Sequence, residues 1–371
     1  MPLNIDIQPF AGIFALSYLV ANIKTLEINR NAIFLFCFSI FAITWALFIK
    51  EENKIVFKIL AFPYALIIYV FIYNTLNKEI ILSVKKYAIV YISFSLFQFI
   101  FPAFYSQFSG ILVRDVKIKD ISGVRGISAL TTEPSFTAFV LFTFLVIICY
   151  SNVFVRTKAI HILNFFIGIC IALTKASTGI IMIATLFLYE GIKRLNIYRI
   201  IIVGTVFIAF YFSINYFDLD KYRAVNLMTI IASSPEKILY QGSLFVRIYS
   251  ITAGFVSLAN NPFGVALGNV DLNSLKMITD SIFYGYTFDI NFELVAPDIN
   301  MPSTLGMGLL IFGYFYLIFY ILLFFPLYVN KNVPALVKFL VFAFTAQSFS
   351  FAFPLLWFLI VMAEKGFWES D

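Results

Sequence analysis

The sequence predicts an all-α, polytopic integral membrane protein with about 10–12 transmembrane helices and a large outward loop. Of 371 residues, 61% are hydrophobic and 12% are charged, against about 25% charged residues in an ordinary soluble domain. The hydrophobic residues gather into runs, and a bilayer-spanning helix needs about 20 largely apolar residues. A water-soluble fold is therefore not expected, and residues 1–371 are expected to form one transmembrane domain.

Hydropathy places the expected spans in order along the chain. The ranges are 9–23, 31–49, 55–76, 87–105, 134–154, 159–173, 177–189, 197–217, 303–329 and 335–363. The last range is long enough to bend at Pro354 and cross twice. Two loops are much longer than the others, 106–132 and 218–302.

The distribution of Lys and Arg predicts the orientation, because short cytoplasmic loops carry the excess of these residues. One set of alternate loops contains Lys24, Arg30, Lys78, Lys85, Lys86, Arg156, Lys158, Lys193, Arg194, Arg199, Lys331 and Lys338. The opposite set contains only Lys50, Lys54 and Lys175. Both long loops and the N-terminus are therefore predicted to face outward. The net charge of +6 then reflects topology, and nucleic acid is not an expected partner.

Neither a metal site nor a cofactor is expected. His161 is the only histidine, and Cys37, Cys149 and Cys170 lie in apolar runs without metal or redox spacing. The cysteines are interpreted as packing residues. No Asp, Glu, Lys or Arg lies near the middle of an expected span, which weakens the alternative of a transporter or a flippase.

Polar residues on the outward side collect first in the segment 124–139, which reads VRGISALTTEPSFTAF. Pro134 suits the first turn of an inward-running helix, and Thr132 or Glu133 can cap that helix. An outward helix N-terminus favours anions, and Arg125 precedes it. Glu133 is either this cap or a carboxylate general base held beside a bound anion.

A second outward turn, 173–179, repeats the pattern of a cation before an inward-running helix. Lys175 lies in this turn, and its two interpretations are a contact with lipid headgroups and a contribution to an anion site.

The third set lies in the 218–302 loop, where 243–259 has the periodicity of an amphipathic helix at the membrane surface. Arg247 lies within that helix, Arg223 upstream of it, and Asp298 just before the next inward-running span. If the three helix N-termini converge, they form a pocket for a multiply charged anion with carboxylates nearby.

Three sequence motifs follow one another in a characteristic order along the predicted topology. They are RGISALTTEPS at 125–135, the Ser-Thr-Gly turn at Ser177, and the segment from Arg247 to Asn269 that contains NPFGVALGN. Together they resemble the O-antigen polymerase and O-antigen ligase superfamily of bacterial envelope proteins, over most of the chain. The resemblance implies a metal-independent glycosyltransferase of the bacterial inner membrane. Such an enzyme works at the periplasmic face on glycans linked to undecaprenyl pyrophosphate.

The resemblance also implies roles for single residues. Arg125 and Arg247 are expected to bind the pyrophosphate, with Arg223 and Lys175 as further cations. The expected base is Glu133, with Asp298 as the second choice, because the attacking sugar hydroxyl must lose a proton. The expected site residues are therefore Arg125, Arg247, Arg223, Lys175, Glu133 and Asp298.

Ligases of this superfamily carry a functional histidine in the large outward loop, and the 218–302 loop has none. This departure favours an O-antigen polymerase over an O-antigen ligase; a flippase or exporter of lipid-linked glycan is the alternative from another class. The expected partners are the lipid-linked glycan donor and acceptor, membrane lipid and a chain-length regulator.

Overall fold

The computed structural model describes residues 9–48, 59–105, 107, 126–131, 134–193, 242–264, 278–279, 281–282, 303–346, 351 and 353–369. Regular secondary structure in these residues is helical, and no β-strand is present among them. The predicted all-α class is therefore confirmed. The chain divides into two compact units: unit 1 is Met1–Leu76 with Leu239–Asp371, and unit 2 is Asn77–Ile238.

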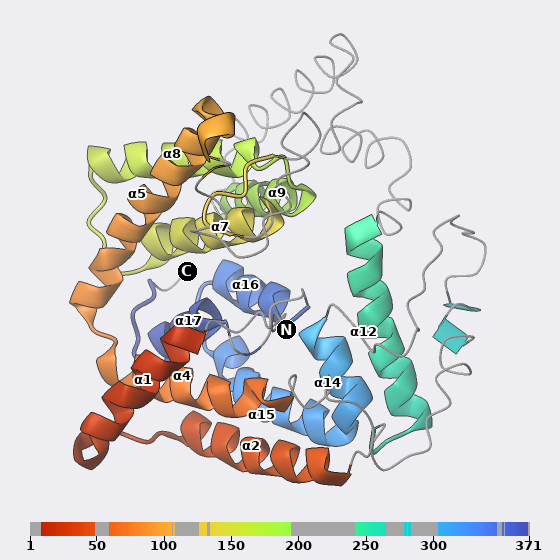
Figure 1. Ribbon diagram of the computed structural model, residues 1–371. Helices are drawn as coiled ribbons and strands as arrows, with labels where there is room; N and C mark the ends of the chain where they lie inside the picture. The colour runs from red at the N-terminus through yellow and green to blue at the C-terminus, as the bar shows by residue number, and fades with distance from the viewer. Residues whose placement is uncertain are drawn as a thin grey trace. The chain divides into compact units, whose positions relative to one another are not determined.

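Unit 1 combines helices from both ends of the chain (Figure 1). They are α1 (Pro9–Ala21), the 3-10 helix η1 (Ile23–Thr25), α2 (Arg30–Phe48), α4 (Ala61–Thr75), α12 (Gly242–Asn260), α14 (Thr304–Phe312), α15 (Tyr314–Val329), α16 (Ala335–Ala346) and α17 (Pro354–Glu364). Helix α4 packs against α1, α2 and α17, and α15 packs against α2. Segments about 300 residues apart in sequence therefore share one bundle.

The core of unit 1 is aromatic. Phe38 of α2 stacks on Phe319 of α15 with ring centroids 4.0 Å apart, and it meets Phe62 of α4 at 4.9 Å. Phe351 lies 5.3 Å from Phe62 and 5.9 Å from Trp357 of α17. All five rings are buried. Because aromatic side chains bury large apolar areas and attract one another in stacked and edge-on pairs, this cluster holds α2, α4, α15 and α17 together.

Unit 2 is built around one largely apolar, buried helix. Its helices are α5 (Lys78–Ile100), α7 (Pro134–Tyr150), α8 (Lys158–Leu173) and α9 (Ser177–Lys193). Helix α7 packs against the other three, and every residue from Thr137 to Ile148 is buried. A helix that is hydrophobic all round belongs in the centre of a bundle, which explains the position of α7.

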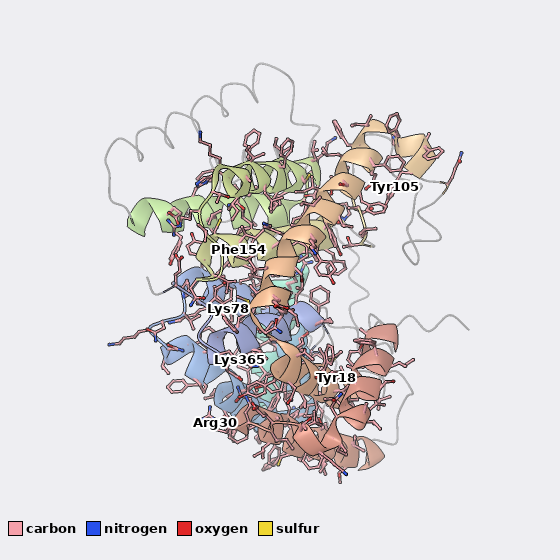
Figure 2. All side chains as sticks on the ribbon, turned by 90° about the vertical axis from the view of Figure 1, so that its left-hand side faces the viewer. Tyr18, Arg30, Lys78, Tyr105, Phe154 and Lys365 are labelled. Carbon is pink, nitrogen blue, oxygen red and sulfur yellow. The ribbon has the colours of Figure 1, made fainter. Side chains whose placement is uncertain are left out.

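Neighbouring helices of unit 2 alternate in direction. At one end, the hydroxyl group of Tyr150, the last residue of α7, donates to Glu190 near the end of α9. At the other end, the segment before α7 meets the turn between α8 and α9, where Ile127 N–H donates to the Leu173 carbonyl at 3.2 Å. Figure 2 labels Lys78 at the start of α5 and Tyr105 beyond its other end. This alternation agrees with the predicted alternation of loops.

Two expected spans, 87–105 and 303–329, differ most from the helices observed. Helix α5 begins at Lys78 instead of Tyr87, because the Asn77 side chain caps it by accepting from Ile80 N–H at 2.9 Å. The lysines that lower the hydropathy of this stretch are good helix formers. The expected span 303–329 is two helices, α14 and α15, which meet at Gly313 with φ 58°.

One described helix, Lys78–Ile100, has both the length and the apolar composition of a membrane span, with 23 residues and a mean hydropathy of 1.6. Nine further apolar helices within the described ranges have 10–17 residues. The polytopic membrane character therefore stays a prediction.

Candidate functional site

In unit 2, the segment 126–131 is fixed by side chains of α5 and α7. The Gln98 Oε1 atom accepts from Ser128 N–H at 2.9 Å and from Ala129 N–H at 2.7 Å. Gln98 also donates weakly to the Ser128 hydroxyl, at 3.4 Å. Gln98, Ser128 and Ala129 are buried. Since a buried N–H without an acceptor is costly, Gln98 is the residue that allows this backbone to be buried.

The same segment is held from two other sides. Tyr105 donates its hydroxyl hydrogen to the Ala129 carbonyl, and Thr137 of α7 donates to the Ser128 carbonyl. The Thr131 and Thr137 hydroxyls lie 2.8 Å apart. Ala129 has φ 43°, a conformation that a non-glycine residue rarely adopts. The surrounding hydrogen bonds offset the cost of this conformation.

The segment lies directly against the turn between α8 and α9. A Cβ atom on Gly126 would lie 2.0 Å from the Thr174 carbonyl oxygen and 2.6 Å from that of Leu173. Only glycine allows so close an approach of two backbones. The sequence predicted two separate features, the motif that contains Arg125 and Gly126 and the turn that contains Lys175. In the structure, Gly126 of the first contacts Thr174 of the second.

Lys175 is half-buried and has φ 50°, and its N–H donates to the Ala172 carbonyl at 3.0 Å. It therefore sits in a tight turn, immediately after the residue that contacts Gly126. Helix α9 begins at Ser177, and Thr178 lies in its first turn and is buried. Pro134 begins α7 as predicted.

In unit 1, Arg247 lies on α12, which confirms the expected helix at 243–259. Ser250 and Gly254, three and seven residues further along, face α14. The Ser303 N–H group donates to the Ser250 hydroxyl at 3.4 Å. A Cβ atom on Gly254 would lie 2.7 Å from the Gly306 carbonyl oxygen. Arg247 thus shares the helix face that packs on α14, and it precedes Ser250 by about one turn.

Helices α12 and α14 run in the same direction. Ser250, in the middle of α12, meets Ser303 at the start of α14, and Gly264, after the end of α12, meets Ile311 near the end of α14. Figure 1 shows α12 alongside α14 and crosswise to α2. With nine residues, α14 is about 14 Å long, roughly half of the bilayer core. Arg247 of α12 precedes Ser250 by about one turn, so it lies toward the N-terminal end of the buried half-helix α14.

The turn 260–264, which contains the NPFG motif, ends α12 and packs against the break between α14 and α15. The Pro262 carbonyl accepts from Tyr314 N–H at 2.8 Å. Gly264 and Gly313 both have positive φ, 77° and 58°. A Cβ atom on Gly264 would lie 2.1 Å from the Ile311 carbonyl oxygen in α14, and one on Gly313 would lie 2.1 Å from the Pro262 carbonyl oxygen. The NPFG motif thus has a structural role at this junction.

Four of the six predicted site residues lie outside the described residues: Arg125, Glu133, Arg223 and Asp298. The two described ones, Lys175 and Arg247, belong to unit 2 and unit 1, respectively. Within the described ranges, no group of three or more His, Cys, Asp or Glu residues could hold a metal ion.

A polar cluster that the sequence did not predict surrounds Glu364, the last residue of α17. Its carboxylate accepts from the Tyr69 hydroxyl at 2.6 Å, from Asn29 Nδ2 at 2.7 Å, and from Asn31 Nδ2. The cluster joins α17 to α4 and to the segment where α2 begins. Nearby, Lys365 Nζ donates to the Leu76 carbonyl at 3.2 Å. Helix α17 thus ends at the same end of unit 1 as the loop before α2.

Comparison with known proteins found no family model, no curated protein and no solved structure that matches this chain.

Proposed function

We propose that this protein is an O-antigen polymerase, a glycosyltransferase of the bacterial inner membrane. It joins undecaprenyl-pyrophosphate-linked oligosaccharide repeat units at the periplasmic face. The observation that carries the proposal is the contact between Gly126 and Thr174. Arg125 is bonded to Gly126, and Lys175 is bonded to Thr174. Because bonded residues have Cα atoms about 3.8 Å apart, the contact between Gly126 and Thr174 supports a common anion site for Arg125 and Lys175.

Exposed apolar faces support the membrane location. On α2, Ile33, Phe36, Ile40 and Ile43 are each between 42% and 53% exposed. Their spacing of three and four residues puts them on one face of the helix. Helix α15 has a similar face, containing Phe315, Ile318, Ile321, Leu322, Phe325 and Val329. Soluble monomers rarely expose continuous apolar surfaces of this kind, whereas lipid covers them without cost.

The distribution of charge agrees with this location. None of the described Asp, Glu, Lys and Arg residues is fully buried. The described cations Lys78, Lys158 and Lys331 lie at helix starts or in loops that we assign to the cytoplasmic side. Lys175 lies in a loop that we assign to the periplasmic side.

The chemistry requires a base, fixed positive charge and two lipid-linked glycans. In the proposed reaction, Glu133 takes the proton from a hydroxyl group of the acceptor sugar. The hydroxyl oxygen then bonds to the anomeric carbon of the donor glycan. The bond from that carbon to the pyrophosphate oxygen breaks, and undecaprenyl pyrophosphate leaves. Arg125, helped by Lys175 and Arg223, stabilises the negative charge that develops on this leaving group. Arg247 of unit 1 is a further proposed pyrophosphate ligand.

The test replaces Arg125, Glu133 or Arg247 by Ala in a strain that lacks its own copy of the gene. Each variant is expected to lose the ladder of polymerised lipopolysaccharide at unchanged protein level. Arg156→Ala is the matched control, because Arg156 is exposed and lies in a loop assigned to the cytoplasm. Normal ladders from all three site variants would overturn the assignment.

Two other functions predict different phenotypes. Loss of a polymerase leaves a single repeat unit on the lipid A core, whereas loss of an O-antigen ligase leaves none. A flippase or exporter would move lipid-linked glycan across vesicles without forming a glycosidic bond.

A further inference from the structure

Gln98 accepts two hydrogen bonds from the backbone of 126–131, one from Ser128 N–H and one from Ala129 N–H. It lies two residues before the end of α5, and the residues it holds are the continuation of the Arg125 motif. Three described side chains that hydrogen-bond to this segment from outside it, Gln98, Tyr105 and Thr137, are neutral. A neutral acceptor satisfies the two N–H groups without adding a negative charge beside an anion site.

We propose that Gln98 is a positioning residue, whose side-chain carbonyl locks residues 126–131 against the turn at Leu173–Lys175. By this lock, Gln98 sets the separation of the two loops that bind the pyrophosphate group of the substrate. The inference rests on the proposed function for the identity of the anion. The lock itself rests on the two hydrogen bonds to Ser128 and Ala129 and on the approach of Gly126 to Thr174.

Two substitutions of Gln98 and one control variant test this role. Gln98→Met keeps the length and approximate shape of the side chain but removes both the acceptor and the donor. Gln98→Glu keeps an oxygen acceptor in either protonation state, so it is the conservative variant. The matched control is Gln107→Met, because Gln107 is exposed and lies nine residues further along.

The first measurement is backbone hydrogen exchange over residues 126–131 in the full-length protein in lipid nanodiscs. It requires no activity. Gln98→Met is expected to speed exchange about tenfold or more, because Ser128 and Ala129 N–H lose their acceptor. Gln98→Glu and Gln107→Met are expected to exchange like the wild type. Unchanged exchange in Gln98→Met would overturn the lock.

The second measurement is polymerisation of lipid-linked repeat units by the same preparations. Gln98→Met is expected to lower kcat/KM about tenfold or more. Gln98→Glu is expected to lose less activity than Gln98→Met, because Glu keeps the acceptor, but to stay below the wild type, because an ionised Glu adds a negative charge beside the anion site. Faster exchange with normal polymerisation would overturn the positioning role. If the wild type forms no glycosidic bond, the proposed function fails, and the exchange data alone decide the lock.

Discussion

Gly126 approaches Thr174 so closely that a Cβ atom on Gly126 would lie 2.0 Å from the Thr174 carbonyl oxygen. The two residues belong to separate outward loops in the predicted topology. Each is next in sequence to a cation, Arg125 or Lys175. Backbone contact between these loops is therefore the feature of unit 2 on which the proposed anion site depends.

Replacing Gly126 by Ala is expected to push the two loops apart. Overpacking of this kind costs about 1–3 kcal/mol of folding free energy, so thermal unfolding in detergent should shift to lower temperature. Gly168→Ala is the control, since no atom lies within 4 Å of a Cβ placed on Gly168. In the interior of α8, that change should be neutral or stabilising by up to about 1 kcal/mol. Equal unfolding temperatures for both variants would contradict the contact.

Gly306→Ala is expected to disrupt the packing of α12 on α14 in unit 1. A Cβ atom there would lie 2.2 Å from the Ser250 carbonyl oxygen, and backbone atoms cannot move aside as a flexible side chain can. We expect a loss of about 1–3 kcal/mol in unfolding free energy. Faster proteolysis within residues 242–260 would report the separation of α12. A Gly306→Ala protein as resistant as the wild type would show that the two helices do not cross at this residue.

Glu364→Ala is expected to destabilise unit 1, because Tyr69 and Asn29 lose an acceptor in a part-buried site. The expected loss in unfolding free energy is about 1–3 kcal/mol, and Glu364→Gln should lose less because its amide oxygen can still accept. Glu27→Ala is the control. Glu27 is exposed, and its backbone N–H, not its carboxylate, bonds to Asn74. If Glu364→Ala unfolds at the same denaturant concentration as Glu27→Ala, the cluster contributes no stability.

Cysteine labelling tests the predicted orientation. Gln107, Lys158 and Lys331 are exposed and can each be replaced by Cys in a background without the native cysteines. An impermeant maleimide applied to spheroplasts is expected to label Gln107→Cys. It should label Lys158→Cys and Lys331→Cys only after the membrane is broken, because their loops are assigned to the cytoplasm. Labelling of all three positions in sealed spheroplasts would rule out the assigned topology.

Hydropathy was enough to predict most of the described helices. The residues 159–173 were expected as one span, and α8 is Lys158–Leu173. The break at Gly313 was not expected, because a single glycine in the apolar run 303–329 does not lower its hydropathy. The positive φ of Gly313 becomes necessary only through the contact with Pro262, and such a contact is not visible in local sequence.

The candidate site was predictable in part. Lys175 was chosen as a cation before a helix N-terminus and Arg247 as a cation within an amphipathic helix, because caps, charges and periodicity are local signals. Their role in a site stays a prediction. Gln98 and Ser250 were missed, since their roles come from backbone groups 30 and 53 residues away. The Glu364 cluster was missed for the same reason, since its Asn29 and Asn31 partners lie more than 300 residues earlier.

The most direct test of the account uses purified protein in liposomes with undecaprenyl-pyrophosphate-linked repeat units. The account predicts lipid-linked products with two or more repeats and one undecaprenyl pyrophosphate released for each bond formed. Arg125→Ala protein should form these products at least about a hundredfold more slowly, because a lost charge contact to the leaving group costs about 3 kcal/mol. Wild-type protein that moves the substrate across the bilayer but forms no glycosidic bond would contradict the account.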